Sequence, residues 1–186
     1  IITGELAERA RLINELIRPD ALISIHINAA PWPKGERRKL VDSDHAHVLI
    51  FGCMSAWELA QSRQQGELIR KMINGSGDIE VLLGKSLGHA LAKGTGLVAS
   101  KYSGDNAVLL DRQHPYLWAR NLMLLRLAEC PVVMLEPYIA NSVTSYPRIQ
   151  EALRARNFHE PLPENDILLE YTSAVVAGIL DAYSSQ

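Results

Sequence analysis

The chain has 186 residues, a length that suits one domain burying roughly 70% of the surface that its unfolded form exposes. Hydrophobic residues make up 47% and charged residues 22%, as in a globular protein, and the net charge of −2 disfavours nucleic acid or an anionic membrane as a partner. No apolar run approaches the roughly 20 residues of a membrane-spanning helix, so we predict no membrane span.

The first part of the chain predicts helix, strand, loop and strand. Residues 4–18 repeat apolar side chains at helical spacing, and Pro19 ends that helix. The stretch ALISIHIN at 21–28 follows as a strand of the buried, β-branched type. Residues 30–46 are rich in proline, glycine and charge and predict a loop, after which HVLIFGC at 47–53 is the next strand.

The remainder adds helices and another buried strand. Residues 116–127 are ambiguous, because the segment suits a helix but its second half also suits a strand. The other predicted elements are two helices within 55–94, an extended or hairpin segment at 96–115, a strand at 131–141, a helix at 145–156 and a terminal helix from about 165. This order predicts a single α/β domain: a mixed, mostly parallel sheet with helices on both faces.

Two of the predicted strands end in an ionisable side chain, His26 in one and Glu136 in the other. Functional sites of open α/β sheets gather where strands reach their carboxyl ends, so an imidazole and a carboxylate can meet there as a zinc ligand and a general base. A histidine on an apolar strand can equally be a hydrogen-bonded core residue. A buried carboxylate needs a partner, and an arginine would serve. The residues alone leave these alternatives open.

Two segments together resemble the zinc-dependent N-acetylmuramoyl-L-alanine amidases of bacterial cell-wall hydrolysis. In ELAERARLINELIRPDALISIHINAAP, a helix bearing Arg11 and Asn14 leads to a strand ending in Ser-Ile-His-Ile-Asn at 24–28. In LLRLAECPVVMLEPYIANS, a Leu-Arg pair and a short turn lead to Pro-Val-Val-Met-Leu-Glu at 131–136. Both motifs stand in the order and context of the family, which makes the pair more specific than either motif alone.

The resemblance implies an activity and a set of roles. The activity is zinc-dependent hydrolysis of the amide between N-acetylmuramic acid and L-alanine in peptidoglycan, with the protein in the periplasm or outside the cell. His26 would bind Zn²⁺, and Glu136 would be the catalytic carboxylate that takes a proton from the attacking water and passes it to the departing amine. Asn28, Asn141 and His114 are candidates for substrate binding.

The sequence departs from the family pattern in three ways. The family's first strand, with its Asp-x-Gly-His-Gly turn, and the glutamate ligand on the following helix are not found. We therefore expect 1–186 to be an amidase-like catalytic domain without its N-terminal strand, with an incomplete zinc site. Tyr138 replaces the usual glycine after the glutamate, and Asn141 falls one place early. Residues 55–115 exceed what a minimal member needs and are expected to include a family-specific helical insertion.

Other interpretations stay open on the sequence. Another zinc amidohydrolase or exopeptidase, acting on a soluble acyl-amino acid or peptide, would use the same chemistry. A catalytically silent cell-wall-binding or regulatory module would need no complete ligand set. His45 and His47 form a His-x-His pair that can bind metal, although such a pair on a polar loop is more often exposed. Trp32 and Trp57 suit either stacking on sugar rings or packing.

Overall fold

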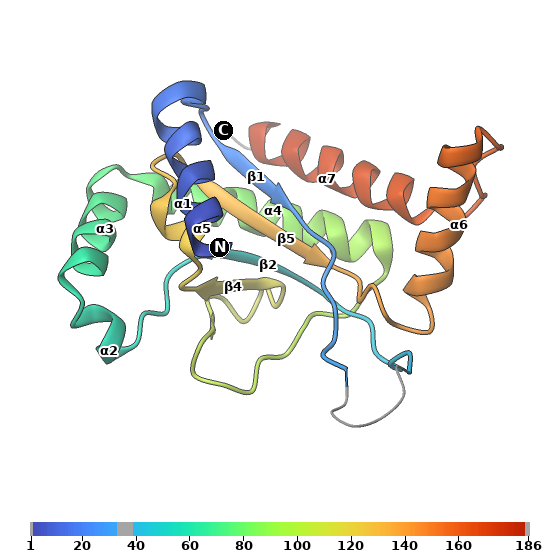
Figure 1. Ribbon diagram of the computed structural model, residues 1–186, viewed down its shortest axis with the longest axis horizontal. Coiled ribbons are helices and arrows are strands. Elements are labelled where there is room, and N and C mark those ends of the chain that lie inside the picture. The colour runs from blue at the N-terminus through green and yellow to red at the C-terminus, as the bar shows by residue number, and fades with distance from the viewer. Residues whose placement is uncertain (1, 33–38, 185–186) are drawn as a thin grey trace.

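A computed structural model describes residues 2–32 and 39–184 of the chain, and its centre is a five-stranded sheet (Figure 1). The strands lie side by side in the order β1-β5-β2-β4-β3. Their bounds are Leu22–Ile25 for β1, Ala46–Phe51 for β2, Val108–Leu109 for β3, Leu117–Arg120 for β4 and Val132–Pro137 for β5.

Helices cover both faces of this sheet, which confirms the predicted single α/β domain (Figure 1). One face packs against α4 and α7, and the other packs against α5, which α1 covers in turn. The helical elements are α1 (Ile2–Leu12), a π-helical turn η1 (Ile13–Ile17), α2 (Ala56–Leu59), α3 (Ser62–Ile73), α4 (Ser76–Thr95), α5 (Met123–Leu127), α6 (Ser145–Phe158) and α7 (Ile167–Ser184).

The sheet is mixed, as predicted, but less parallel than we expected. Within the described residues, β1 pairs with β5 and β2 with β4 in parallel, whereas β2–β5 and β3–β4 are antiparallel. The reason lies between β1 and β2. A parallel return needs a crossover, usually a helix, and the described part of the segment between these strands contains none. β2 therefore runs back in the opposite direction to β1 and β5.

For residues 116–127 we considered a helix, or a strand in the second half, and the structure has the strand in the first half. Their first half forms β4 and their second half forms α5. The strand assignment follows from tertiary pairing, because Leu117–Arg120 lies in register with residues 48–51 of β2. The first of the two helices expected within 55–94 is divided into α2 and α3, and Ser55 caps α2 in a capping box with Glu58.

The helix α4, which falls in the expected insertion at 55–115, belongs to the core. Its Leu83, Leu87 and Leu91 are buried against the sheet and α7. The two helices approach closely at Gly178, where an added Cβ would lie 2.9 Å from the Cα of Leu87. By length and composition alone α7 could cross a membrane, a criterion that a core helix also meets.

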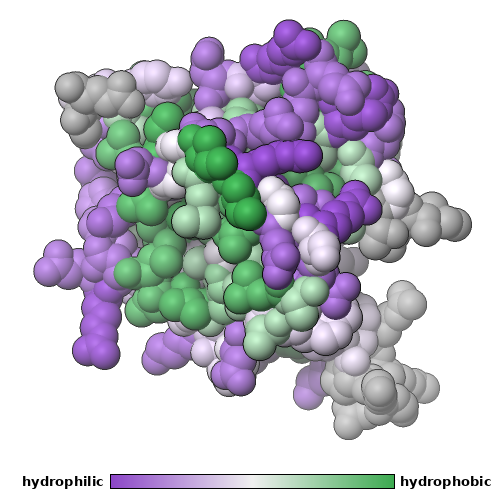
Figure 2. Space-filling model, turned by 90° about the vertical axis from the view of Figure 1, so that its left-hand side faces the viewer, coloured by the Kyte–Doolittle hydropathy of each residue, from purple (hydrophilic) through white to green (hydrophobic). Residues whose placement is uncertain are grey.

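The end of the molecule formed by α3 exposes apolar side chains on its surface (Figure 2) and buries charged ones. Apolar Ile69, Met72 and Ile73 are exposed there, whereas Glu67 and Lys71 are buried. The two inward-facing charges have partners on other helices: Glu67 accepts from Arg126 of α5, and Lys71 donates to Glu80 of α4. A helix can turn polar groups inward only when such partners exist.

Candidate functional site

Three side chains form a row where β1 and β5 end. Ile25 of β1 lies opposite Leu135 of β5, so His26 leaves β1 at the level of Glu136. On the other side of β5, His47 lies directly opposite Glu136. Opposed residues of paired strands share a face of the sheet, so the three side chains gather on one face. We call this set, His26, Glu136 and His47, the imidazole–carboxylate row.

The contact between Glu136 and His47 is short and sheltered. Nε2 of His47 lies 2.6 Å from Oε2 of Glu136, and the two side chains are 1% and 17% exposed, respectively. Nδ1 of His47 is buried and has no hydrogen-bond partner among the described residues. A proton on Nδ1 would be an unsatisfied donor, so the favoured tautomer carries its proton on Nε2. His47 therefore donates a hydrogen bond to the carboxylate of Glu136.

These surroundings keep Glu136 ionised. Burial by itself would raise the pKa of Glu136, but the hydrogen bond from His47 and the positive charges that His47, His26 and Arg120 can carry outweigh it. The net result is a pKa below the ordinary glutamate value. A carboxylate that stays deprotonated and is partly open to solvent can accept a proton from water, which is the chemistry of a general base.

The prediction that His26 and Glu136 lie at neighbouring strand ends is confirmed. The imidazole of His26 is exposed, and its Nε2 lies 3.0 Å from Oγ of Ser24. Its backbone N–H donates to the carbonyl oxygen of Leu135 at 3.0 Å, which fixes the chain as it leaves β1. In the part of the chain that the structure describes, no group of three or more His, Cys, Asp or Glu side chains is arranged to hold a metal ion.

Asn28 and Asn141 fasten together the segments that follow β1 and β5. The backbone carbonyl of Asn28 accepts a hydrogen bond from the N–H of Ala140 at 2.7 Å. The side chain of Asn141 is buried, accepts from the N–H of Ala30 at 2.8 Å and donates to the carbonyl of Ala30 at 3.0 Å. These contacts give Asn141 a positioning role, and a role for either residue in substrate binding stays a prediction.

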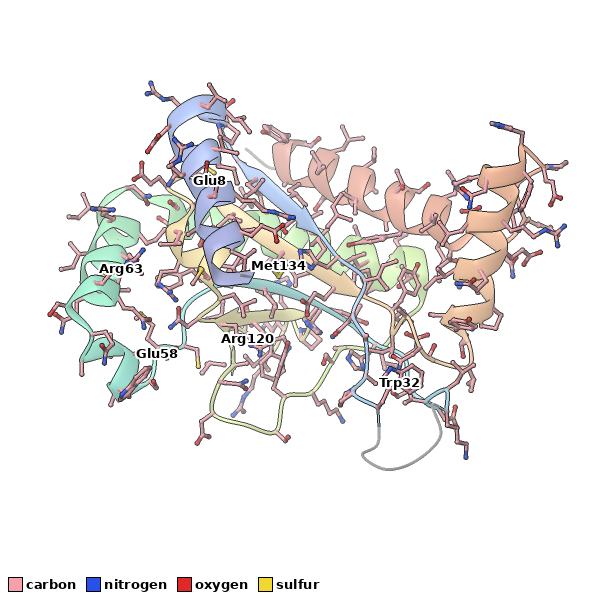
Figure 3. The ribbon with its side chains drawn as sticks, viewed as in Figure 1. Glu8, Trp32, Glu58, Arg63, Arg120 and Met134 are labelled. Atoms are coloured by element: carbon pink, nitrogen blue, oxygen red, sulfur yellow. The ribbon has the colours of Figure 1, made fainter. Side chains whose placement is uncertain are left out.

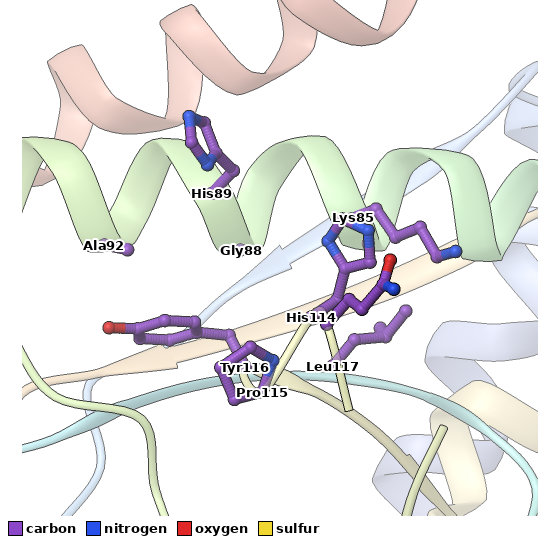
Figure 4. Close-up of a pocket in the computed structure, with 10 residues that line it drawn as sticks. Lys85, Gly88, His89, Ala92, His114, Pro115, Tyr116 and Leu117 are labelled. Carbon is purple, nitrogen blue, oxygen red and sulfur yellow. The ribbon is translucent and has the colours of Figure 1, made fainter. Parts of the chain in front are cut away.

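His114 lies apart from the row (Figure 4). It lines a pocket against α4 with Lys85, His89 and Tyr116, and no member of the row lines that pocket. Its Nε2 is 4.0 Å from Oδ2 of Asp111. The structure therefore does not bring His114 to the candidate site.

The sequence pattern did not indicate a role for His47, Tyr102 or Arg120. The strand predicted at 47–53 does include His47, but we expected the His45–His47 pair to be exposed, whereas His47 is almost fully buried in β2. The hydroxyl of Tyr102 lies 2.9 Å from Nε2 of His47, and the guanidinium carbon of Arg120 lies 5.5 Å from the centre of the Tyr102 ring. Trp118 packs edge-on against the same ring. The local signal for His47 was its position at the start of the apolar run VLIF.

No family model and no curated protein match this sequence. Solved structures of amidases do match its fold. Two are the N-acetylmuramyl-L-alanine amidase Ami1 from Mycobacterium smegmatis and the apo form of Ami1 from Mycobacterium abscessus. Both have a TM-score of 0.57, with 21% and 20% identity, and they align over 97% and 96% of this chain and 61% of their own. The N-acetylmuramoyl-L-alanine amidase from Clostridium difficile 630 has a TM-score of 0.50 at 16% identity, over 97% of this chain and 63% of its own.

At these identities the likeness establishes a shared fold. The chain spans about three fifths of the length of the solved amidases that it matches.

Proposed function

We propose that this protein hydrolyses the amide between N-acetylmuramic acid and L-alanine in peptidoglycan, with Glu136 as its general base. The observation that carries the proposal is the ionised, partly exposed carboxylate of Glu136, which is held by His47 at the end of β5. The fold, shared with solved N-acetylmuramyl-L-alanine amidases, supports the choice of substrate.

The proposed chemistry assigns one proton path to this chain. Glu136 accepts a proton from the water whose oxygen bonds to the amide carbon, and then delivers that proton to the nitrogen as the carbon–nitrogen bond breaks. His47 donates to the carboxylate and is itself buried, so it holds the carboxylate in place and favours its ionised form. His47 therefore acts as a positioning residue.

Zinc is part of the proposal, but the described residues fit it only in part. Of the row, His26 is the side chain suited to bind metal, because its imidazole is exposed at the strand end while His47 is engaged with Glu136. A catalytic zinc normally takes three protein ligands, and residues 2–32 and 39–184 hold no such group. We therefore propose His26 as a single zinc ligand and assign no step of the reaction to the metal.

The proposed substrate determines where the protein would act. Peptidoglycan lies outside the cytoplasmic membrane, so we propose a periplasmic or extracellular location and peptidoglycan or its fragments as the partner.

Glu136→Gln in the full-length protein tests the proposal. Glutamine keeps the size of the side chain but cannot accept the proton, so turnover should fall by about 10²- to 10⁴-fold. The assay is release of free L-alanine amino termini from purified peptidoglycan, and Glu151→Gln on the exposed surface of α6 is the matched control. Near-normal turnover in Glu136→Gln would reduce Glu136 to a structural carboxylate. Cleavage of soluble peptides but not of peptidoglycan would favour an exopeptidase.

His26→Ala separates metal binding from proton transfer. We expect His26→Ala to lose zinc and activity together, whereas Glu136→Gln keeps its zinc content, measured on the same samples. Full zinc content in His26→Ala would contradict the assignment of His26 as a ligand.

A further inference from the structure

Arg120 differs from the other half-buried arginines of the described chain. Arg126, Arg148 and Arg156 each form an ion pair with a carboxylate, at 2.6, 2.9 and 2.5 Å. Arg120 forms no such pair within residues 2–32 and 39–184, although it is half-buried at the end of β4. A guanidinium removed from bulk water is stabilised by a planar anion, and a carboxylate matches its fork of donors.

The Arg120 side chain shares the sheet face of the imidazole–carboxylate row. Arg120 lies opposite Phe51 in the β2–β4 pairing. His47 precedes Phe51 by four residues on β2, and residues an even number apart on a strand point to the same face of the sheet. The guanidinium lies over the ring of Tyr102, whose hydroxyl reaches His47. The charge of Arg120 also contributes to the lowered pKa of Glu136. Arg120 and Glu136 are therefore electrostatically linked along one surface.

A cleft opens in front of Arg120, between the ends of β2 and β4 and the start of α2. Figure 3 shows Arg120 on β4 and Glu58 on α2, two of the elements that border it. Trp57 is 71% exposed in this cleft, so it is not a packing residue. The lining includes Trp57, Glu58, Asp105, Asn106, Arg120 and Asn121.

The charges of the lining restrict the ligand. Glu58 accepts hydrogen bonds from the backbone N–H and hydroxyl of Ser55 and from the side chain of Asn121. The hydrogen bond from the Ser55 backbone is the main cause that lowers the pKa of Glu58. An ionised Glu58 and the nearby Asp105 repel a multiply charged anion such as a phosphate group. Because the carboxylate of Glu58 is bound by Ser55 and Asn121, the single guanidinium of the lining, Arg120, is left to hold one carboxylate through two parallel hydrogen bonds.

We propose that Arg120 and this cleft form a subsite for a carboxylate of the peptide on the amine side of the scissile bond. The proposal rests on the proposed function and assigns to Arg120 the recognition of one carboxylate of its substrate. The lactyl carboxyl of N-acetylmuramic acid is consumed in the amide, so an anionic group here has to come from the peptide. Arg120 is joined to Glu136 through only two side chains, Tyr102 and His47, which places the two within reach of a short extended peptide.

The test compares soluble N-acetylmuramoyl peptides that carry one free carboxylate at the second, third or fourth residue with the same peptides as carboxamides. In the unmodified full-length protein, kcat/KM for at least one acidic peptide should exceed that of its carboxamide by about 10- to 100-fold. Arg120→Gln should abolish this preference, and Arg120→Lys should retain part of it. Arg70→Gln removes one exposed positive charge of α3 and should leave the preference unchanged.

Binding of the free peptides, measured by calorimetry without turnover, separates this inference from the proposed function. Absence of cleavage in every variant would overturn the amidase proposal, while tighter binding of the acidic peptide that is lost in Arg120→Gln would still support the subsite. Equal cleavage or equal binding of acid and carboxamide peptides by the unmodified protein would overturn the subsite. Circular dichroism of Arg120→Gln verifies that the variant is folded.

Discussion

Replacing Lys71 with methionine should strongly destabilise this protein. Nζ of Lys71 donates to Oε1 of Glu80 at 2.5 Å and to the carbonyl of Cys130 at 3.1 Å, and the side chains of the pair are only 5% and 3% exposed. Methionine keeps the length and apolar character of the lysine stem. It leaves Glu80 with the N–H of Val132, at 3.0 Å, as its remaining described partner. A buried carboxylate in that position has lost its compensating charge.

Breaking a buried ion pair in this way typically costs about 3 to 5 kcal/mol of unfolding free energy. For a chain of this length, 1 kcal/mol lowers Tm by about 2 to 4 °C, so we expect a fall of roughly 10 °C. Thermal and urea unfolding followed by circular dichroism measure the loss. Arg63→Met is the matched control. Arg63 pairs with Glu67 at 3.1 Å but is 80% exposed, so its loss should cost less than about 1 kcal/mol.

The pH dependence gives the Lys71→Met prediction a second test. Burial raises the pKa of Glu80 above its ordinary value of 4.5, although the hydrogen bond and charge of Lys71 oppose the rise. The folded state then binds this proton more tightly than the unfolded state, so Glu80 lowers stability as pH rises through that window. Without Lys71 the window extends upward, and Lys71→Met should recover stability from pH 7 toward pH 5 relative to wild type. A loss below 1 kcal/mol with no recovery would refute this account of the pair.

Three other substitutions test the fold and the site. Asp166→Asn keeps an oxygen that can cap α7 but removes the two-point ion pair with Arg156, and should cost about 1 to 2 kcal/mol in urea unfolding at pH 7. The cost should shrink as pH falls through the folded pKa of Asp166, which Arg156 lowers, because wild type then loses the same contacts. Gly178→Ala forces a Cβ against the backbone of Leu87 and should cost about 1 to 3 kcal/mol in the same assay. His47→Phe removes the hydrogen-bond donor to Glu136, the proposed general base, so the acidic limb of the kcat/KM profile should move to higher pH.

Two members of the imidazole–carboxylate row could be predicted because the information is local. His26 and Glu136 each interrupt an apolar strand at its end, and burying an ionisable group without a partner is costly. Parallel strands then bring their carboxyl ends to one edge, whatever the distance between them in the sequence. The same local patterns gave the strands β1, β2 and β5 to within a few residues.

The third member, His47, could not be predicted because its role depends on strand direction. Only an antiparallel β2 puts its first residues beside the end of β5, where His47 meets Glu136. The direction is set by how the chain returns after β1, and residues 33–38 of that return lie outside the described structure. The position of Arg120 could not be predicted for a related reason. Leu117–Arg120 forms a strand by pairing with β2, and its sequence has no strong strand pattern of its own.

The orientation of α3 shows the same limit away from the site. Apolar spacing would turn Ile69 and Met72 inward, yet the helix buries Glu67 and Lys71. Glu67 accepts from Arg126 of α5 at 2.6 Å, and Lys71 donates to Glu80 of α4, so each inward charge is neutralised by another element. Hydrophobic periodicity assumes that polar groups find their partner in water. Wherever a tertiary contact supplies that partner, at His47 as on α3, a polar side chain can turn inward against the local pattern, and these are the positions where the sequence pattern misleads.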